Sequence, residues 1–133
     1  MIQIENEVFD DIATALEAEF PGIDVSSEYD PTPAVFPHVS IEMTDSYSPS
    51  ERETNSLIEK YNVCTFTVNV YSNKTAGRKQ ECADILNFIE DHLRRKNFRR
   101  ESRLPVPNLE DSTIYRITAR YVVETDGTLF YRR

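Results

Sequence analysis

Apolar residues recur at helical spacing in two segments of this chain. In residues 4–20 they follow one another at every fourth position, and acidic residues fill the opposite side. Residues 75–96 carry a second apolar stripe with the 3.6-residue period of a helix. The two stripes are Ile4, Val8, Ile12, Leu16 and Phe20 in the first segment, and Cys82, Ile85, Leu86, Ile89 and Leu93 in the second. The pattern predicts two amphipathic helices, the first of which ends at Pro21-Gly22.

Polar and apolar residues alternate in three further segments, as they do in strands that bury one face. These segments are residues 36–44, 61–71 and 113–125. One predicted face of the second segment consists of Cys64, Phe66, Val68 and Val70, and one face of the third consists of Tyr115, Ile117, Ala119, Tyr121 and Val123. Shorter strands are expected over residues 23–29, 98–104 and 128–131. The rigid Pro105-Val106-Pro107-Asn108 sequence is expected to end the strand before it.

Residues 45–59 are polar and interrupted by Pro49, and they are predicted to form a mobile loop. The resulting order is a helix, two or three strands, a second helix and two or three more strands. Because the strands are sequential and only two helices are present, most strand pairs should be antiparallel. The chain of 133 residues has the length of one domain. We therefore expect a single α+β domain over residues 1–133, with two layers and a mixed, mostly antiparallel sheet flanked by two main helices.

The composition is that of a folded protein, with 39% hydrophobic residues and with seven Tyr and seven Phe. The two cysteines, Cys64 and Cys82, are expected to be buried thiols in a reducing compartment. The N-terminal residues lack the basic and apolar regions of a signal peptide, and no apolar run has the length of a membrane span. We therefore expect a soluble protein that is cytoplasmic when synthesised and has no membrane partner.

Charge is divided unevenly between the two halves of the chain. Residues 1–60 contain 14 acidic and 2 basic residues, a net charge of −12, whereas residues 61–133 contain 9 acidic and 13 basic residues, a net charge of +4. Such a division is not needed to form a core and is typical of a surface that meets another charged surface. The overall charge of −8 argues against a dedicated binder of duplex DNA.

No arrangement of residues has the spacing of a catalytic or metal site. His38 and His92 are not tied to a nucleophile, and no Cys or His pair lies at ligand spacing. The acidic pairs Asp10-Asp11, Glu90-Asp91 and Glu110-Asp111 are interpreted as solvated faces. Three glycines are too few for a phosphate-binding loop. We therefore expect no enzymatic activity, no metal and no cofactor.

Two basic clusters are candidate contact sites. Lys74, Arg78 and Lys79 lie at the start of the second helix, where cations oppose the helix dipole, so either a partner anion or plain solvation is possible. In the second cluster Arg94 to Lys96 suit a helix C-terminus, but three further arginines exceed that need. These are Arg99, Arg100 and Arg103. They are compatible with phosphate binding or with pairing to an acidic neighbour.

The layout of these segments resembles the tail-terminator, or tail-completion, proteins of long-tailed bacteriophages. The resemblance is carried by an acidic N-terminal helix followed by PHVSIEMTD, YNVCTFTVNVYSN, KTAGRKQECADILNFIEDHL, FRRESRLPVPN and the long final strand TIYRITARYVV. It covers most of the chain and contains no short diagnostic motif. It implies a structural virion protein, made in the host cytoplasm and located at the head–tail junction. No catalytic residue is implied.

The resemblance also implies a ring of identical subunits, commonly six, that caps the tail tube. Its partners would be further copies of itself, the tail tube protein and head or neck connector proteins, with DNA only as cargo through the lumen. The charge division suits a ring, because a head-to-tail interface joins two different patches of one chain. The interface candidates are Lys74, Arg78, Lys79, Arg99, Arg100, Arg103, Asp10, Asp11 and Glu17.

Two alternatives remain open from the sequence. Another head–tail joining or neck protein of the same particle would have the same features. A small nucleic-acid-binding α+β module is a different class, in which Arg116 and Arg120 would add to the contacts of residues 99–103. Only one aromatic residue, Phe98, is interleaved with these arginines, which disfavours a base-stacking surface.

Overall fold

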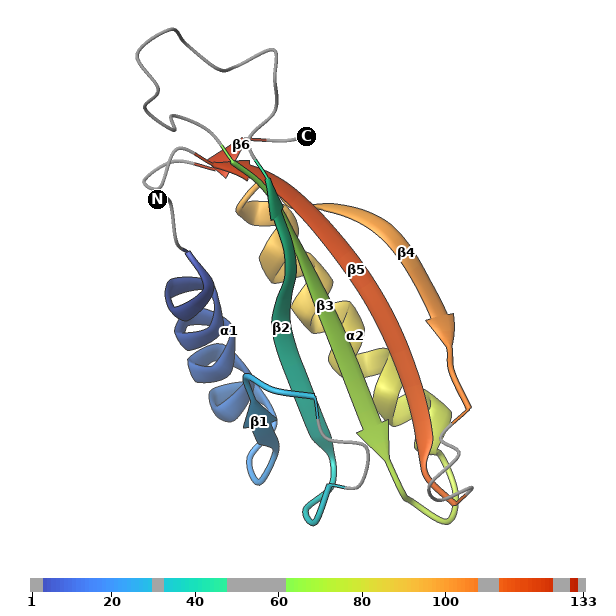
Figure 1. Cartoon of the computed structure of the whole chain (residues 1–133). Coiled ribbons are helices and arrows are strands. Elements are labelled where there is room, and N and C mark those ends of the chain that lie inside the picture. The colour runs from blue at the N-terminus through green and yellow to red at the C-terminus, as the bar shows by residue number, and fades with distance from the viewer. Residues whose placement is uncertain (1–3, 30–32, 48–61, 108–112, 126–129, 132–133) are drawn as a thin grey trace, which may run out of the picture.

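The structure, a computed structural model, describes residues 4–29, 33–47, 62–107, 113–125 and 130–131. One mixed sheet carries two helices on the same face (Figure 1). The elements in chain order are α1 (Glu5–Glu19), β1 (Asp24–Ser26), β2 (His38–Tyr47), β3 (Asn62–Ser72), α2 (Arg78–Arg95), β4 (Arg99–Pro105), β5 (Tyr115–Thr125) and β6 (Phe130–Tyr131). The predicted two-layer α+β fold is confirmed.

The strand order β1-β2-β3-β5-β4 places β1 and β4 at opposite ends of the sheet, and β6 pairs with the end of β5. All pairs are antiparallel except β1 with β2, which is parallel. Helix α2 packs along β3 and β5, and α1 lies beside it against β2 (Figure 1). The acidic helix therefore lies near the β1–β2 end of the sheet, whereas the arginine-rich strand β4 forms the other end.

Side-chain alternation on the central strands decides which face the helices cover. Both predicted apolar faces, that of β3 and that of β5, pack against the stripes of α1 and α2 in one core. Both cysteines are thiols buried in this core, as predicted. Burial, with the nearby charge of Glu81, raises the pKa of the Cys82 thiol to about 12, so this thiol stays protonated at neutral pH. The second face of the sheet, which we call the outer face, carries the polar residues of the same strands.

Strand β2 is longer than the alternation predicted. A register shift after Met43 lets Asp45, Ser46 and Tyr47 continue the pairing with β3. The prediction of a mobile loop over residues 45–59 is therefore wrong for residues 45–47, because a bulge absorbs the break in alternation. Residues 48–59 lie outside the described residues, and for them the loop stays a prediction.

Two further boundaries differ from the sequence pattern. Helix α2 begins at Arg78 and not at Thr75, because Gly77 before it has a φ of +81°, which is outside the helical region. Strand β4 includes Pro105, which was expected to lie beyond its end. Because β4 is the edge strand, the missing N–H of a proline need not remove a bond of the ladder.

The chain reverses between α2 and β4 through a Schellman motif. Asn97 has a φ of +70°, and its N–H donates to the carbonyl of Arg94 at 3.1 Å. The N–H of Phe98 donates to the carbonyl of Leu93 at 3.1 Å, and both of these side chains are fully buried. This reversal directs β4 back along the sheet beside α2.

Replacing Asn97 tests how much the reversal depends on its left-handed residue. Asn97→Ala should lower the free energy of unfolding by about 1 kcal/mol, because alanine adopts a positive φ at a cost. Asn97→Gly is the matched control. Its free energy of unfolding should lie within about 0.5 kcal/mol of that of the parent, since glycine adopts this conformation freely. Urea denaturation measures both variants, and equal losses for the two would contradict the assignment.

Candidate functional site

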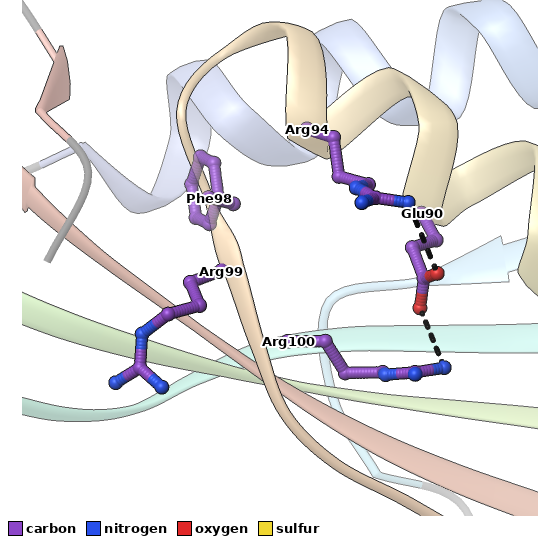
Figure 2. A pocket seen from close by; sticks show the side chains of 5 residues that line it. All are labelled: Glu90, Arg94, Phe98, Arg99 and Arg100. Carbon is purple, nitrogen blue, oxygen red and sulfur yellow. Dashed lines mark hydrogen bonds and ion pairs between the residues drawn. The ribbon is translucent and has the colours of Figure 1, made fainter.

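A basic pocket lies between the last turns of α2 and the first residues of β4. It has a volume of about 230 Å³ and is lined by Glu90, Arg94, Phe98, Arg99 and Arg100 (Figure 2). The Schellman turn forms this pocket, because it brings the end of the helix and the start of the strand to the same edge of the molecule. Phe98 forms its apolar base and is fully buried, in edge contact with Phe66 at a ring distance of 5.7 Å.

Among the described residues, Glu90 is the only carboxylate that lines this pocket, and its side chain is 13% exposed. It accepts a hydrogen bond from Arg100 at 3.4 Å and one from the Tyr121 hydroxyl at 3.1 Å, and Arg94 lies 4.0 Å away. Burial, then the charge and hydrogen bond of Glu90, raise the pKa of Tyr121, which keeps this hydroxyl a donor. Three arginines against one carboxylate leave the lining with a formal charge of +2.

Strand β4 distributes its arginines over both faces of the sheet. Arg100 and Arg103 lie opposite Tyr121 and Ala119, which face the helices, and Arg103 donates to the Asn87 side chain of α2 at 2.7 Å. Arg99 lies opposite Val122 and points away from the Glu90 carboxylate (Figure 2). The structure thus brings all three predicted arginines to one edge strand, where they give that edge a positive charge on both sides.

The acidic residues of α1 fall into two groups. Asp11 is used within the chain, because its Oδ2 lies 2.8 Å from His92 Nε2 and 3.0 Å from Lys96 Nζ, both in the last part of α2. Asp10 and Glu17 are exposed and lie with Glu7 along one outward side of the helix. The interpretation of Asp10-Asp11 as a solvated pair is therefore wrong for Asp11, and that of Glu90-Asp91 is wrong for Glu90, since each meets cations of its own chain.

The first basic cluster lies at the N-terminal end of α2, where Arg78 is about 18 Å along the helix axis from Glu90 of the basic pocket. Lys74 Nζ lies 3.0 Å from Glu81, which also accepts a hydrogen bond from Ser72 at 2.6 Å. Part of this cluster is thus balanced inside the chain. Arg78 and Lys79 occupy the first turn of α2 after the left-handed Gly77, and they are not among the residues that line the basic pocket.

Sequence reasoning missed Glu90 as part of the basic pocket, and it missed the Tyr121 hydroxyl as the hydrogen-bond donor to Glu90. The i, i+4 spacing of Glu90 and Arg94 was a usable signal, because such residues are neighbours on a helix surface. The contact of Glu90 with Arg100 depends on the chain reversal. Asn97-Phe98 after a basic helix end is its sequence signature, since asparagine tolerates the left-handed conformation.

Within the described residues, no group of three or more His, Cys, Asp or Glu side chains is arranged to hold a metal ion. No helix among these residues is both long and apolar enough to cross a membrane. In comparisons with known proteins, no family model matches the chain, and no curated protein matches it closely enough to count as a relative.

The Asp11 contact predicts a pH dependence of stability. Partial burial raises the pKa of Asp11, but the hydrogen bonds and charges of His92 and Lys96 lower it by a larger amount. The net result is a pKa below the ordinary 3.8. A pKa lowered by folding stabilises the protein above the unfolded pKa, and this contribution is lost as the pH falls through the folded value. Because Asp11 is 38% exposed, we expect a contribution below about 1 kcal/mol.

Urea unfolding between pH 6 and pH 2.5 measures this contribution. Asp11→Asn should be less stable than the parent at pH 6, and the difference should vanish at the acidic limit. The exposed neighbour Asp10 provides the control, since Asp10→Asn should follow the parent curve at every pH. A constant difference between Asp11→Asn and the parent over the whole range would show that the charge of Asp11 is not the cause.

Proposed function

We propose that the protein is a structural subunit that joins head-to-tail with its own copies into a closed ring, as a tail terminator at the head–tail junction of a bacteriophage. The observation that carries the proposal is the position of opposite charge at opposite ends of the sheet. Exposed carboxylates of α1 lie near the β1–β2 end, and arginines of β4 lie at the other end. A head-to-tail interface needs two such unlike patches on one chain.

The charges that remain after internal pairing support this arrangement. The ion pairs within the chain use Asp11 with Lys96, and Glu90 with both Arg94 and Arg100 of the basic pocket. They leave Asp10 and Glu17 exposed on α1, about 10 Å apart along the helix axis. The lining of the basic pocket keeps a formal charge of +2, so it is suited to accept a carboxylate from a neighbouring subunit.

The resemblance in sequence layout supplies the rest of the proposal. In the tail-terminator family the ring commonly has six subunits, caps the tail tube and offers a face to the head or neck. The partners proposed here are therefore further copies of the chain, the tail tube and connector proteins, with DNA passing through the ring as cargo. The role is structural and non-enzymatic, and a neighbouring head–tail joining protein would share it.

Charge reversal at the two ends tests the head-to-tail contact. The parent should form a discrete ring at high protein concentration and low salt, measured by sedimentation and native mass spectrometry. Arg99→Glu with Arg103→Glu should raise the concentration needed for assembly at least about tenfold, because like charges would then face each other. Asp10→Lys with Glu17→Lys should have the same effect from the other side.

Combining all four substitutions in one chain is the decisive arm of this experiment. The positive charges then lie on α1 and the negative charges on β4, so opposite charges face each other again. Assembly should therefore return towards that of the parent. Lys79→Glu, a charge reversal at the distant end of α2, is the control and should leave assembly unchanged. A parent that stays monomeric at high concentration and low salt contradicts self-assembly, and failure of the fourfold variant to recover contradicts the pairing of these two ends.

The nucleic-acid-binding alternative has one observation in its favour. Arg99, Arg116 and Arg120 all belong to the outer face of the sheet. Binding of duplex or single-stranded DNA that weakens by orders of magnitude over a few-fold rise in salt would support that alternative. The absence of DNA binding at low salt would remove it and would leave the ring proposal unaffected.

A further inference from the structure

The outer face of the sheet contains a second pocket, which does not involve either charged end. Its volume is about 300 Å³, near the lower end of the range for small-ligand sites. The lining residues come from β2, β3, β5 and the segment after β1, and they are Tyr29, Glu42, Thr44, Thr67, Asn69 and Arg116. Arg116 is the only cation among them.

The guanidinium of Arg116 is held in a fixed position by neutral groups. Its Nε donates to Asn69 Oδ1 at 3.0 Å, and its Nη1 donates to the Tyr29 hydroxyl at 3.1 Å. The ring of Tyr29 lies 4.9 Å from the guanidinium carbon and that of Tyr71 lies 5.9 Å from it. Asn69 is itself fixed, because its Oδ1 also accepts the Thr118 hydroxyl at 2.6 Å. The side chain is thus preorganised before any ligand arrives.

This half-buried cation has no carboxylate within ion-pair distance among the described residues. All of its recorded contacts are with an amide, a hydroxyl and two aromatic rings. Partly buried charges in proteins are normally paired, and a guanidinium presents a planar set of five donors that matches an oxyanion. Two of those donors are used, and the remainder are available to an anion in the pocket.

The other polar groups of the pocket favour one kind of anion. The Thr44 and Thr67 hydroxyls lie 2.9 Å apart and add hydrogen-bonding capacity to the wall. Glu42 accepts a hydrogen bond from the main-chain N–H of Tyr29 at 3.3 Å, and its carboxylate contributes a negative charge to the lining. Among the described residues, Arg116 and Glu42 give the lining a formal charge of zero, so a second negative charge on the ligand gains little Coulomb attraction, whereas the cost of desolvating an ion rises with the square of its charge. The pocket therefore favours a carboxylate over a phosphate.

We propose that this pocket binds a carboxylate group, with Arg116 as the charged partner and Asn69 and Thr67 as neighbouring donors. The carboxylate is supplied either by an acidic side chain of a protein partner or by a small free carboxylic acid. The proposal does not depend on ring formation, because the pocket lies on the outer face and uses no residue of the two charged ends.

Titration of the folded protein with three probes tests the proposal. The probes are sodium acetate, glutamate blocked at both its amino and its α-carboxyl group, and inorganic phosphate, all at constant ionic strength. The side-chain amide signal of Asn69 and the main-chain signal of Thr118 in nuclear magnetic resonance spectra report on the pocket. Saturable shifts with both carboxylates, and weaker binding of phosphate, are expected. Blocked glutamate binding more tightly than acetate assigns the site to a protein side chain, and the reverse order assigns it to a free acid.

Substitution of the charged residues should change the affinity for carboxylates in defined directions. Arg116→Gln should weaken carboxylate binding about tenfold or more, since a hydrogen bond to a charged group is lost. Glu42→Gln should strengthen binding several-fold, because it removes the repulsive charge and retains an acceptor for the Tyr29 N–H. Arg120→Gln is the matched control, a cation of the same strand and face outside the pocket, and it should change nothing.

Two further variants separate binding from folding. Arg116→Lys keeps the positive charge but loses the planar set of donors, so it should bind several-fold more weakly while the amide spectrum stays that of the folded protein. Tyr29→Phe removes one fixing hydrogen bond and should weaken binding less than Arg116→Gln does. Shifts that do not saturate, tighter binding of phosphate than of acetate, or equal losses in Arg116→Gln and Arg120→Gln would each overturn the proposal.

Discussion

Packing of both helices on one face of the sheet is the constraint on which the rest of this structure depends. The odd and even positions of β3 and β5 differ in polarity, so only one face can pack against helices. Placing α1 and α2 together on that face leaves the polar positions on the other side. It also leaves α1 near one end of the sheet and β4 at the other (Figure 1). The charged ends and the outer-face pocket both follow from this single division.

Elements whose side-chain period is strong were predictable from the sequence. The apolar stripes of α1 and α2 and the alternation of β3 and β5 gave the fold class, the faces and the buried cysteines. The misplaced boundaries lie where local backbone geometry overrides the pattern. Gly77 delays α2, a bulge after Met43 extends β2, and the edge position of β4 admits Pro105.

The basic pocket was predictable in part, because a run of arginines is visible in the sequence and its pairing partners are not. Arg99, Arg100 and Arg103 were identified from charge alone, and they lie on one edge strand. The partners Glu90 and Asn87 lie on α2, so these contacts depend on the reversal at Asn97. The contact of Arg116 with Tyr29 joins residues that are 87 positions apart in the chain, so no local sequence pattern predicts it.

Internal ion pairs change what the charge division of the chain means. The net charges of the two halves suggest two uniform poles, but Asp11 of the first half pairs with Lys96 of the second. Glu90 pairs with Arg100, and Glu81 pairs with Lys74, within the second half. In each of these pairs one side chain is more than a third exposed, and surface pairs contribute only about 0–1 kcal/mol each to stability. Their larger effect is to decide which charges remain for a partner. Those that remain are directional. Carboxylates face outward from α1, arginines extend along β4, and Arg116 is held by an amide and a hydroxyl group on the outer face. The carboxylates of α1 and the arginines of β4 thus lie at opposite ends of the sheet, and Arg116 lies on β5 between those ends.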